Sequence, residues 1–112
     1  MKIIGGKTEK ELMDWANGAV GDSEPHITKF DDKPNLKSAR YWLAIIKSIE
    51  PKGIDNDLIT AGDNDEDAKQ NARYAISLAR SIGATIFCLW EDLVYVKKKQ
   101  CFILAAVLMQ LS

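Results

Sequence analysis

The longest uninterrupted apolar run in the chain lies near its C-terminus. Nine consecutive residues, Cys101 to Met109, carry no charge and no polar group beyond a thiol and a thioether. A helix at a protein surface carries polar residues along one side, so this run predicts a helix that is buried all round. The run is about half of the ~20 residues that cross a bilayer, which argues against a membrane span. A buried strand is the competing interpretation. The alanines and leucines favour a helix from Cys101 to Leu111, with three core residues that define it: Phe102, Leu104 and Leu108.

The first of three amphipathic segments begins at Thr8. Its hydroxyl, followed three residues later by the carboxylate of Glu11, forms a capping-box pattern. The apolar stripe of this segment consists of Leu12, Trp15, Ala16 and Ala19. We expect Trp15, the bulkiest member, to anchor the helix on the core.

The second segment follows a polar, proline-containing stretch. It is predicted to run from Leu36 to about Ile49, with Asn35 as its N-cap, and Pro51 and Gly53 end it. The predicted buried face consists of Leu36, Ala39, Trp42, Leu43, Ile46 and Ile49.

The third segment opens with acidic residues, Asp63 to Glu66, which suit the positive end of a helix dipole, and Gly83 closes it. Its apolar stripe consists of Ala68, Ala72, Ala75, Ala79 and Ile82. Because alanines let a neighbouring helix approach closely, we expect this helix to pack directly on the C-terminal one. Asn71 lies on the same stripe, and a buried amide is tolerated only when it is hydrogen-bonded. We therefore predict that Asn71 ties its helix to the backbone of a neighbouring loop.

The remaining segments read as connections. Ala84 to Leu89 has the composition of a strand but no partner strand, so we expect an extended, buried link. Trp90 to Val94 predicts a short helical turn in which Asp92 has a structural role at the positive end of the dipole. Residues 1–6 read as a linker with a hinge at Gly5–Gly6, and residues 7–112 as one domain. The predicted fold is all-α: four main helices, joined by short helical turns, around a central apolar C-terminal helix.

Charge and composition argue against some classes of function. Fifteen basic and sixteen acidic residues leave a net charge of −1, so no global field favours nucleic acid or an anionic membrane. The N-terminus is too short before its glycines for a signal peptide, and we expect a cytoplasmic location. Cys88 and Cys101 stand in apolar surroundings, as reduced core thiols do, and a disulfide between them is the alternative.

Candidate chemistry is sparse. His26 is the only histidine and sits in a proline-bounded polar loop with no sign of a catalytic partner. The acidic run from Asp63 fails as a calcium loop, because Ala68 and Tyr74 occupy the positions that require glycine and glutamate. Neither cysteine has the spacing of a zinc site. We therefore expect no metal, no cofactor and no enzymatic activity.

Two groups of lysines are the candidate contact surfaces. One consists of Lys97, Lys98 and Lys99, and the other of Lys2, Lys7 and Lys10. Each group is either a solvated helix end or an electrostatic contact with an acidic partner. The pattern of residues thus predicts a helical binding domain.

Several motifs resemble the calponin-homology domain. They are the first-helix tryptophan in Leu12–Asn17, the helix Asn71–Gly83, and Glu91–Val94 followed by a lysine-rich entry to an apolar helix. The phrase Ser48–Ile59 and the linker Ile4-Gly5-Gly6 are most similar to the fimbrin (plastin) family, and within it to the last of four such domains.

Two single positions and one short run depart from that family's pattern. Trp90 stands where proline is usual, Lys47 where aspartate is common, and the run Arg40–Trp42 is bulkier than expected. These departures put details of partner contact in doubt rather than the fold.

The resemblance implies a fold and a partner. It implies the calponin-homology fold and binding to filamentous actin through a tandem pair of domains, in which the second domain adds stability and auxiliary contacts. Met1 directly before the linker indicates a piece excised from a longer protein, expected to be monomeric in isolation. The alternative is an adaptor domain of the same family that binds another protein or microtubules, although a balanced charge suits acidic tubulin tails poorly.

Overall fold

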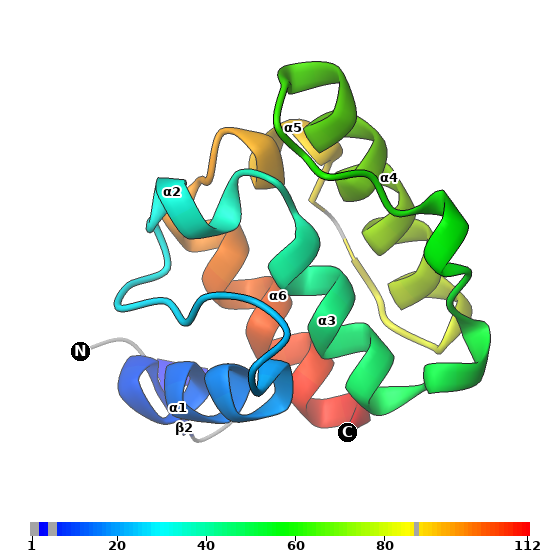
Figure 1. The fold of residues 1–112 in the computed structure, drawn as a ribbon. Helices are drawn as coiled ribbons and strands as arrows, with labels where there is room; N and C mark the ends of the chain where they lie inside the picture. The colour runs from blue at the N-terminus through cyan, green and yellow to red at the C-terminus, as the bar shows by residue number, and fades with distance from the viewer. Residues whose placement is uncertain (1–2, 5–6, 87) are drawn as a thin grey trace.

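The structure is a computed structural model that describes residues 3–4, 7–86 and 88–112, with side chains from residue 8 onward (Figure 1). Six α-helices make up most of it: α1 (Glu9–Val20), α2 (Lys33–Leu36), α3 (Arg40–Ile49), α4 (Asp65–Ser81), α5 (Trp90–Val94) and α6 (Lys98–Leu111). Two 3-10 turns follow α3: η1 (Pro51–Gly53) and η2 (Asn56–Leu58). Near the N-terminus, β1 (Ile3–Ile4) and β2 (Lys7–Thr8) form an antiparallel pair in which Ile3 is opposite Thr8. The predicted all-α fold with four main helices is confirmed, and the predicted Gly5–Gly6 hinge lies outside the described residues.

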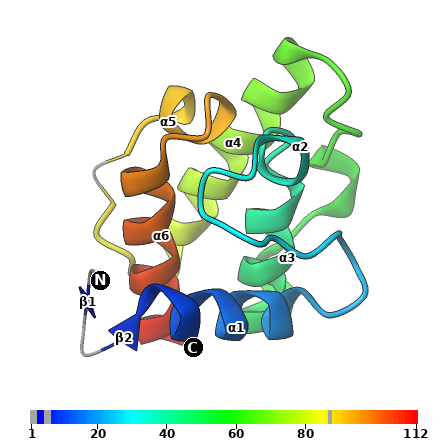
Figure 2. The ribbon, with the colours of Figure 1, turned by 90° about the vertical axis from the view of Figure 1, so that its left-hand side faces the viewer.

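The C-terminal helix α6 is the centre of the core, as its sequence predicts. Phe102, Leu104 and Leu108 are 4%, 3% and 0% exposed. The ring of Phe102 meets that of Phe30 edge to face, with centroids 5.5 Å apart. Helices α1, α3 and α5 all contact α6, and Figure 2 shows α1 crossing both α3 and α6.

Two details of α6 differ from the prediction. The helix begins at Lys98, three residues before the apolar run, because the lysines before the run form its first turn. One face, which carries Ile103, Val107 and Leu111, is only half-buried, so the helix is not covered all round.

Helix α1 has the predicted capping box. The Thr8 hydroxyl accepts from the Glu11 backbone N–H at 3.2 Å, and the Glu11 carboxylate accepts from the Thr8 N–H. Leu12 and Ala16 are fully buried, whereas Trp15 is half-buried and packs against the edge of the core. Leu12 and Ala16, rather than Trp15, therefore make the deepest contacts of α1 with the core.

The predicted second helix is two helices. Its first residue, Leu36, is the last residue of α2, and α3 begins only at Arg40, because Ala39 adopts a left-handed backbone with φ of 63°. Asn35 lies inside α2 and is not the cap of a long helix. Leu36 and Ala39 are still buried, because the break turns both side chains into the core.

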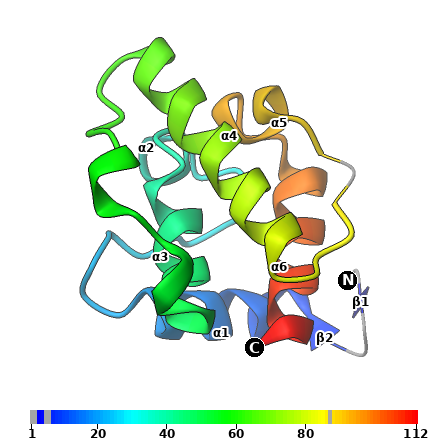
Figure 3. The same cartoon turned by 90° about the vertical axis from the view of Figure 1, so that its right-hand side faces the viewer.

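Helix α4 keeps its predicted alanine stripe buried, and Gly83 follows its end with a positive φ of 105°. Its closest helical neighbours are α3 and α5 (Figure 3), so α4 does not pack mainly on α6, as the alanine stripe had predicted. The following link is buried only in part: Ala84 and Cys88 are buried, whereas Leu89 is 58% exposed. No helix in the described part of the chain has the length and apolar character that crossing a membrane requires.

Candidate binding surfaces

The predicted lysine groups meet at the starts of α1 and α6. The Lys98 ammonium lies 3.8 Å from the carboxylate of Glu9, which ties the first turn of α6 to that of α1. Lys10, next to Glu9, pairs with Asp14 at 3.3 Å. The Glu9–Lys98 pair links the segments that carry the two lysine groups, and we call Lys10, Lys97, Lys98 and Lys99 together the α1–α6 lysine region.

The lysines of this region differ in their partners. Lys97 pairs with Asp92 at 3.2 Å but is still 60% exposed. Lys99 is exposed and borders a hollow beside Ile103 on the half-buried face of α6. The side chain of Lys7 lies outside the described residues. Exposed ion pairs of this kind are weak and break readily, so these ammonium groups can exchange an internal carboxylate for one on a partner.

Asp92 fixes the entry into α5. Its carboxylate accepts a hydrogen bond from the Leu89 N–H at 2.9 Å and pairs with Lys97 on its other oxygen. The side chain is only 16% exposed, so these contacts replace most of its hydration. The structural role predicted for Asp92 is thus matched by its position, and α5 is held to the segment that leads into α6.

Asn71 holds the centre of the other side of the domain. It is 0% exposed. Its Oδ1 accepts from the Thr60 N–H at 2.8 Å, and its Nδ2 donates to the Ser38 and Thr60 carbonyls at 3.0 and 3.1 Å. One amide therefore joins α4 to the loop before it and to the α2–α3 break, as predicted for a buried asparagine.

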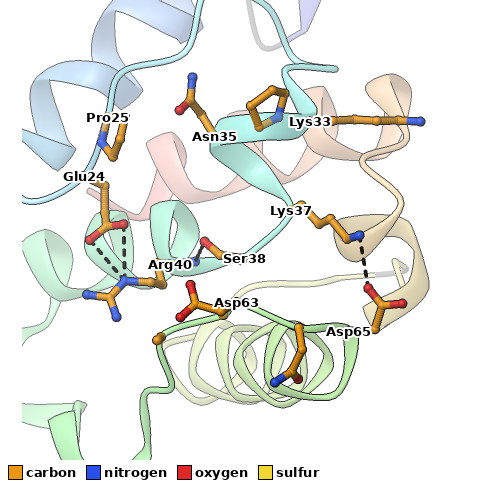
Figure 4. Close-up of a pocket in the computed structure, with 13 residues that line it drawn as sticks. Glu24, Pro25, Lys33, Asn35, Lys37, Ser38, Arg40, Asp63 and Asp65 are labelled. Atoms are coloured by element: carbon orange, nitrogen blue, oxygen red, sulfur yellow. Dashed lines mark hydrogen bonds and ion pairs between the residues drawn. The ribbon is translucent and has the colours of Figure 1, made fainter.

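A polar hollow of about 480 Å³ opens above this junction (Figure 4). The Arg40 Nε lies 3.3 Å from both oxygens of Glu24, and its Nη1 donates to the Thr60 carbonyl at 3.1 Å. On the opposite wall Lys37 pairs with Asp65 at 3.0 Å. The charged groups that line the hollow largely neutralise one another. The hollow is therefore better suited to holding two loops together than to binding a charged ligand. Arg40 is a structural residue that the sequence pattern placed outside the buried face.

The bulky run in α3 is accommodated in the core. Tyr41 and Trp42 are both 0% exposed, and their rings meet edge to face with centroids 5.5 Å apart. The Tyr41 hydroxyl donates to Asn17 Oδ1 at 2.7 Å, and the Asn17 amide also pairs with the backbone of Ile27. These contacts dock the long loop after α1 onto α3.

The two cysteines and the single histidine are the remaining groups of a type that often carries chemistry. Burial raises the pKa of the Cys101 thiol to about 12, and burial together with the Asp92 carboxylate raises the pKa of Cys88. Both thiols are free. Within the described residues the His26 ring makes one hydrogen bond, between its Nε2 and the Gly21 carbonyl, at 2.7 Å. Within the described residues no three His, Cys, Asp or Glu side chains are arranged to hold a metal ion.

Comparison with known proteins defines the class. A family model of the calponin homology (CH) domain matches residues 6–112, and the chain belongs to this family. It is not a family of enzymes, so the domain works by binding.

Fimbrins and plastins are among the proteins that the chain resembles in sequence. The chain is 39% identical over 107 residues to Fimbrin-5 of Arabidopsis thaliana and 37% identical over 105 residues to Plastin-3 of Rattus norvegicus. These matches cover 94% and 91% of the chain but only 15% and 16% of the relatives. The crystal structure of the actin-crosslinking core of Schizosaccharomyces pombe fimbrin superimposes with a TM-score of 0.83 and 32% identity, over 90% of this chain and 22% of that one.

Proposed function

We propose that this chain is an actin-filament-binding module of a fimbrin-type cross-linking protein. The observation that carries the proposal is the match to the actin-crosslinking core of a fimbrin, with 32% identity and a TM-score of 0.83 over 90% of the chain. In this proposal residues 7–112 are the domain and residues 1–6 link it to a preceding one. The protein acts in the cytoplasm, on the actin cytoskeleton.

The domain's place is the second of a tandem pair, and the fourth of four. The motifs Ser48–Ile59 and Ile4-Gly5-Gly6 support this place. In this position the domain stabilises its partner domain and adds auxiliary contacts, and by itself it is a monomer. The chain spans about one sixth of the relatives' length, so filament cross-linking requires further domains.

The deciding experiment replaces a domain of Schizosaccharomyces pombe fimbrin with residues 7–112 and measures actin bundling by low-speed co-sedimentation. Replacement of the fourth domain should preserve bundling, whereas replacement of the third should reduce it. Loss of high-speed pelleting with filaments in both chimaeras, while both remain folded, would refute actin binding. Equal bundling by both would refute only the assignment to the fourth place.

The contact residues in this proposal are Lys7, Lys10, Lys97, Lys98 and Lys99. A tandem pair in which Lys97, Lys98 and Lys99 are all changed to glutamate should bind filaments more weakly, and the wild-type affinity should fall with added salt. The matched control changes Lys29, Lys47 and Lys52, which are exposed and lie elsewhere, to glutamate. Equal affinity for the two triple variants would show that the lysines at α6 only solvate a helix end.

The Lys97 change also places a carboxylate beside Asp92, so the unfolding midpoints of both triple variants are measured alongside the binding. The single variant Lys99→Glu avoids this complication, because no ion pair of Lys99 is seen within the described residues.

A further inference from the structure

A second basic surface lies on α4, away from the residues proposed above. Lys69, Arg73 and Arg80 follow one another at intervals of four and seven residues, which places them on one face of the helix. In the described part of the chain none of the three forms an ion pair with a carboxylate. The Arg80 Nη2 donates a long hydrogen bond of 3.4 Å to the Ile86 carbonyl, and the Lys69 ammonium lies 4.7 Å from the ring centre of Trp90.

A hollow of about 340 Å³ lies beside these cations, between α4 and the segment that leads into α5. Figure 3 shows α4 next to α5, whose first residue is Trp90. The hollow is lined by Arg73, Ile76, Ser77, Arg80, Cys88, Leu89 and Trp90. The lining contains two guanidinium groups, an indole and aliphatic side chains but no carboxylate. Leu89 is 58% exposed at its rim and adds an apolar side chain to the surface beside the two guanidinium groups.

The carboxylate of Asp92, two residues after Trp90, pairs with other groups and not with these cations. Asp92 binds the Leu89 N–H and Lys97, as described above. In a chain whose net charge is only −1, these three cations form no ion pair in the described part of the chain and share their helix spacing with one acidic residue, Glu66, which leaves a local excess of positive charge.

We propose that this surface, which consists of Lys69, Arg73, Arg80, Leu89 and Trp90, docks an acidic protein segment that also carries an apolar side chain. Arginine forms paired, charge-assisted hydrogen bonds with a carboxylate, so Arg73 and Arg80 bind two acidic side chains of the segment. The apolar side chain between them enters the hollow against Leu89 and Trp90. The apolar lining is the reason to expect a protein segment, because a small free anion would leave that lining exposed to water. This partner contact is additional to the proposed actin contact and does not depend on it.

The test is an NMR titration of the 112-residue chain with a short, terminally blocked peptide of glutamates around two leucines. The signals of Arg73, Arg80 and the Trp90 indole N–H should shift and saturate. The same peptide with glutamine in place of glutamate should bind at least about tenfold more weakly. The double variant Arg73→Glu/Arg80→Glu should lose binding to a similar extent, whereas Arg73→Lys/Arg80→Lys should keep part of it.

The matched control is Lys29→Glu/Lys47→Glu, which changes the net charge equally at exposed sites elsewhere and should bind the peptide as the wild type does. Absence of shifts, shifts centred on the α1–α6 lysine region, or equal loss in both double variants would overturn the proposal. Vesicles containing anionic lipid are titrated in parallel, and shifts with the vesicles but not the peptide would assign the surface to lipid and overturn it too.

Discussion

The substitution Asn71→Ala should be the most damaging polar-to-alanine change in the domain. It removes three hydrogen bonds of 2.8–3.1 Å from a side chain that is 0% exposed. Three bonds at a net ~1 kcal/mol each predict a loss of about 3 kcal/mol. The Thr60 carbonyl keeps its bond from Arg40, but the Thr60 N–H loses its only partner seen in the structure. The figure of about 3 kcal/mol therefore does not overstate the loss of stability.

This loss is large relative to the stability of a single domain, which is roughly 5–15 kcal/mol. For a chain of 112 residues it corresponds to a fall in the unfolding midpoint of about 12 °C, at ~4 °C per kcal/mol. Urea denaturation followed by circular dichroism gives the free energy of unfolding directly. Gln70→Ala is the matched control, since Gln70 is the exposed preceding residue of α4 and its loss should be neutral or slightly stabilising. A loss below about 1 kcal/mol for Asn71→Ala would refute the idea that this amide holds three segments together.

Two further predictions concern the backbone and the ionisation of the core. Gly62→Ala should destabilise the fold by several kcal/mol, because Gly62 has φ of 76° and an added Cβ would lie 2.5 Å from Ser38 Cβ. At Gly18 an added Cβ would meet no atom within 4 Å, so Gly18→Ala should stabilise α1 by roughly 0.5–1 kcal/mol. Urea denaturation of the two variants measures both, and a loss for Gly18→Ala equal to that of Gly62→Ala would contradict the reasoning. Tyr41→Phe should cost ~1 kcal/mol at neutral pH by removing the hydroxyl bond to Asn17. Burial raises the pKa of Tyr41 above its ordinary 10.0, so the tyrosine's contribution is complete below pH 10.0 and is lost as the pH rises above it. The wild type should therefore lose stability above that pH more steeply than Tyr41→Phe, and parallel pH profiles would contradict the prediction.

The sequence predicted secondary structure well where residues close together in the chain determine it. The uncharged run predicted α6, and the Thr8–Glu11 pattern predicted the start of α1, because both depend on residues a few positions apart. Asn71 was predictable because an amide on an apolar stripe requires partners. Its particular partners, Ser38 and Thr60, come from two other segments and could not be read from the sequence.

The break between α2 and α3 could not be predicted from the local sequence pattern. Leu36 and Ala39 continue the apolar spacing of α3, so periodicity predicts one helix. The left-handed backbone at Ala39 costs roughly 1–2 kcal/mol, and tertiary contacts offset it, among them the bond from Asn71 to the Ser38 carbonyl. The ion pairs of Lys97 and Lys98 are likewise tertiary, as is the hollow that Leu89 and Trp90 form with α4.

The central claim is that the apolar run of α6 is the innermost part of the domain, and that the candidate binding groups lie at the first turn of α6 or on other elements. Amide hydrogen exchange of the native chain, followed residue by residue, tests this claim most directly. The amides of Leu104, Ala105 and Leu108 should exchange only through global unfolding, with opening free energies equal to the free energy of unfolding measured in urea. Exchange of these amides at lower free energies than those of α1 would contradict the account.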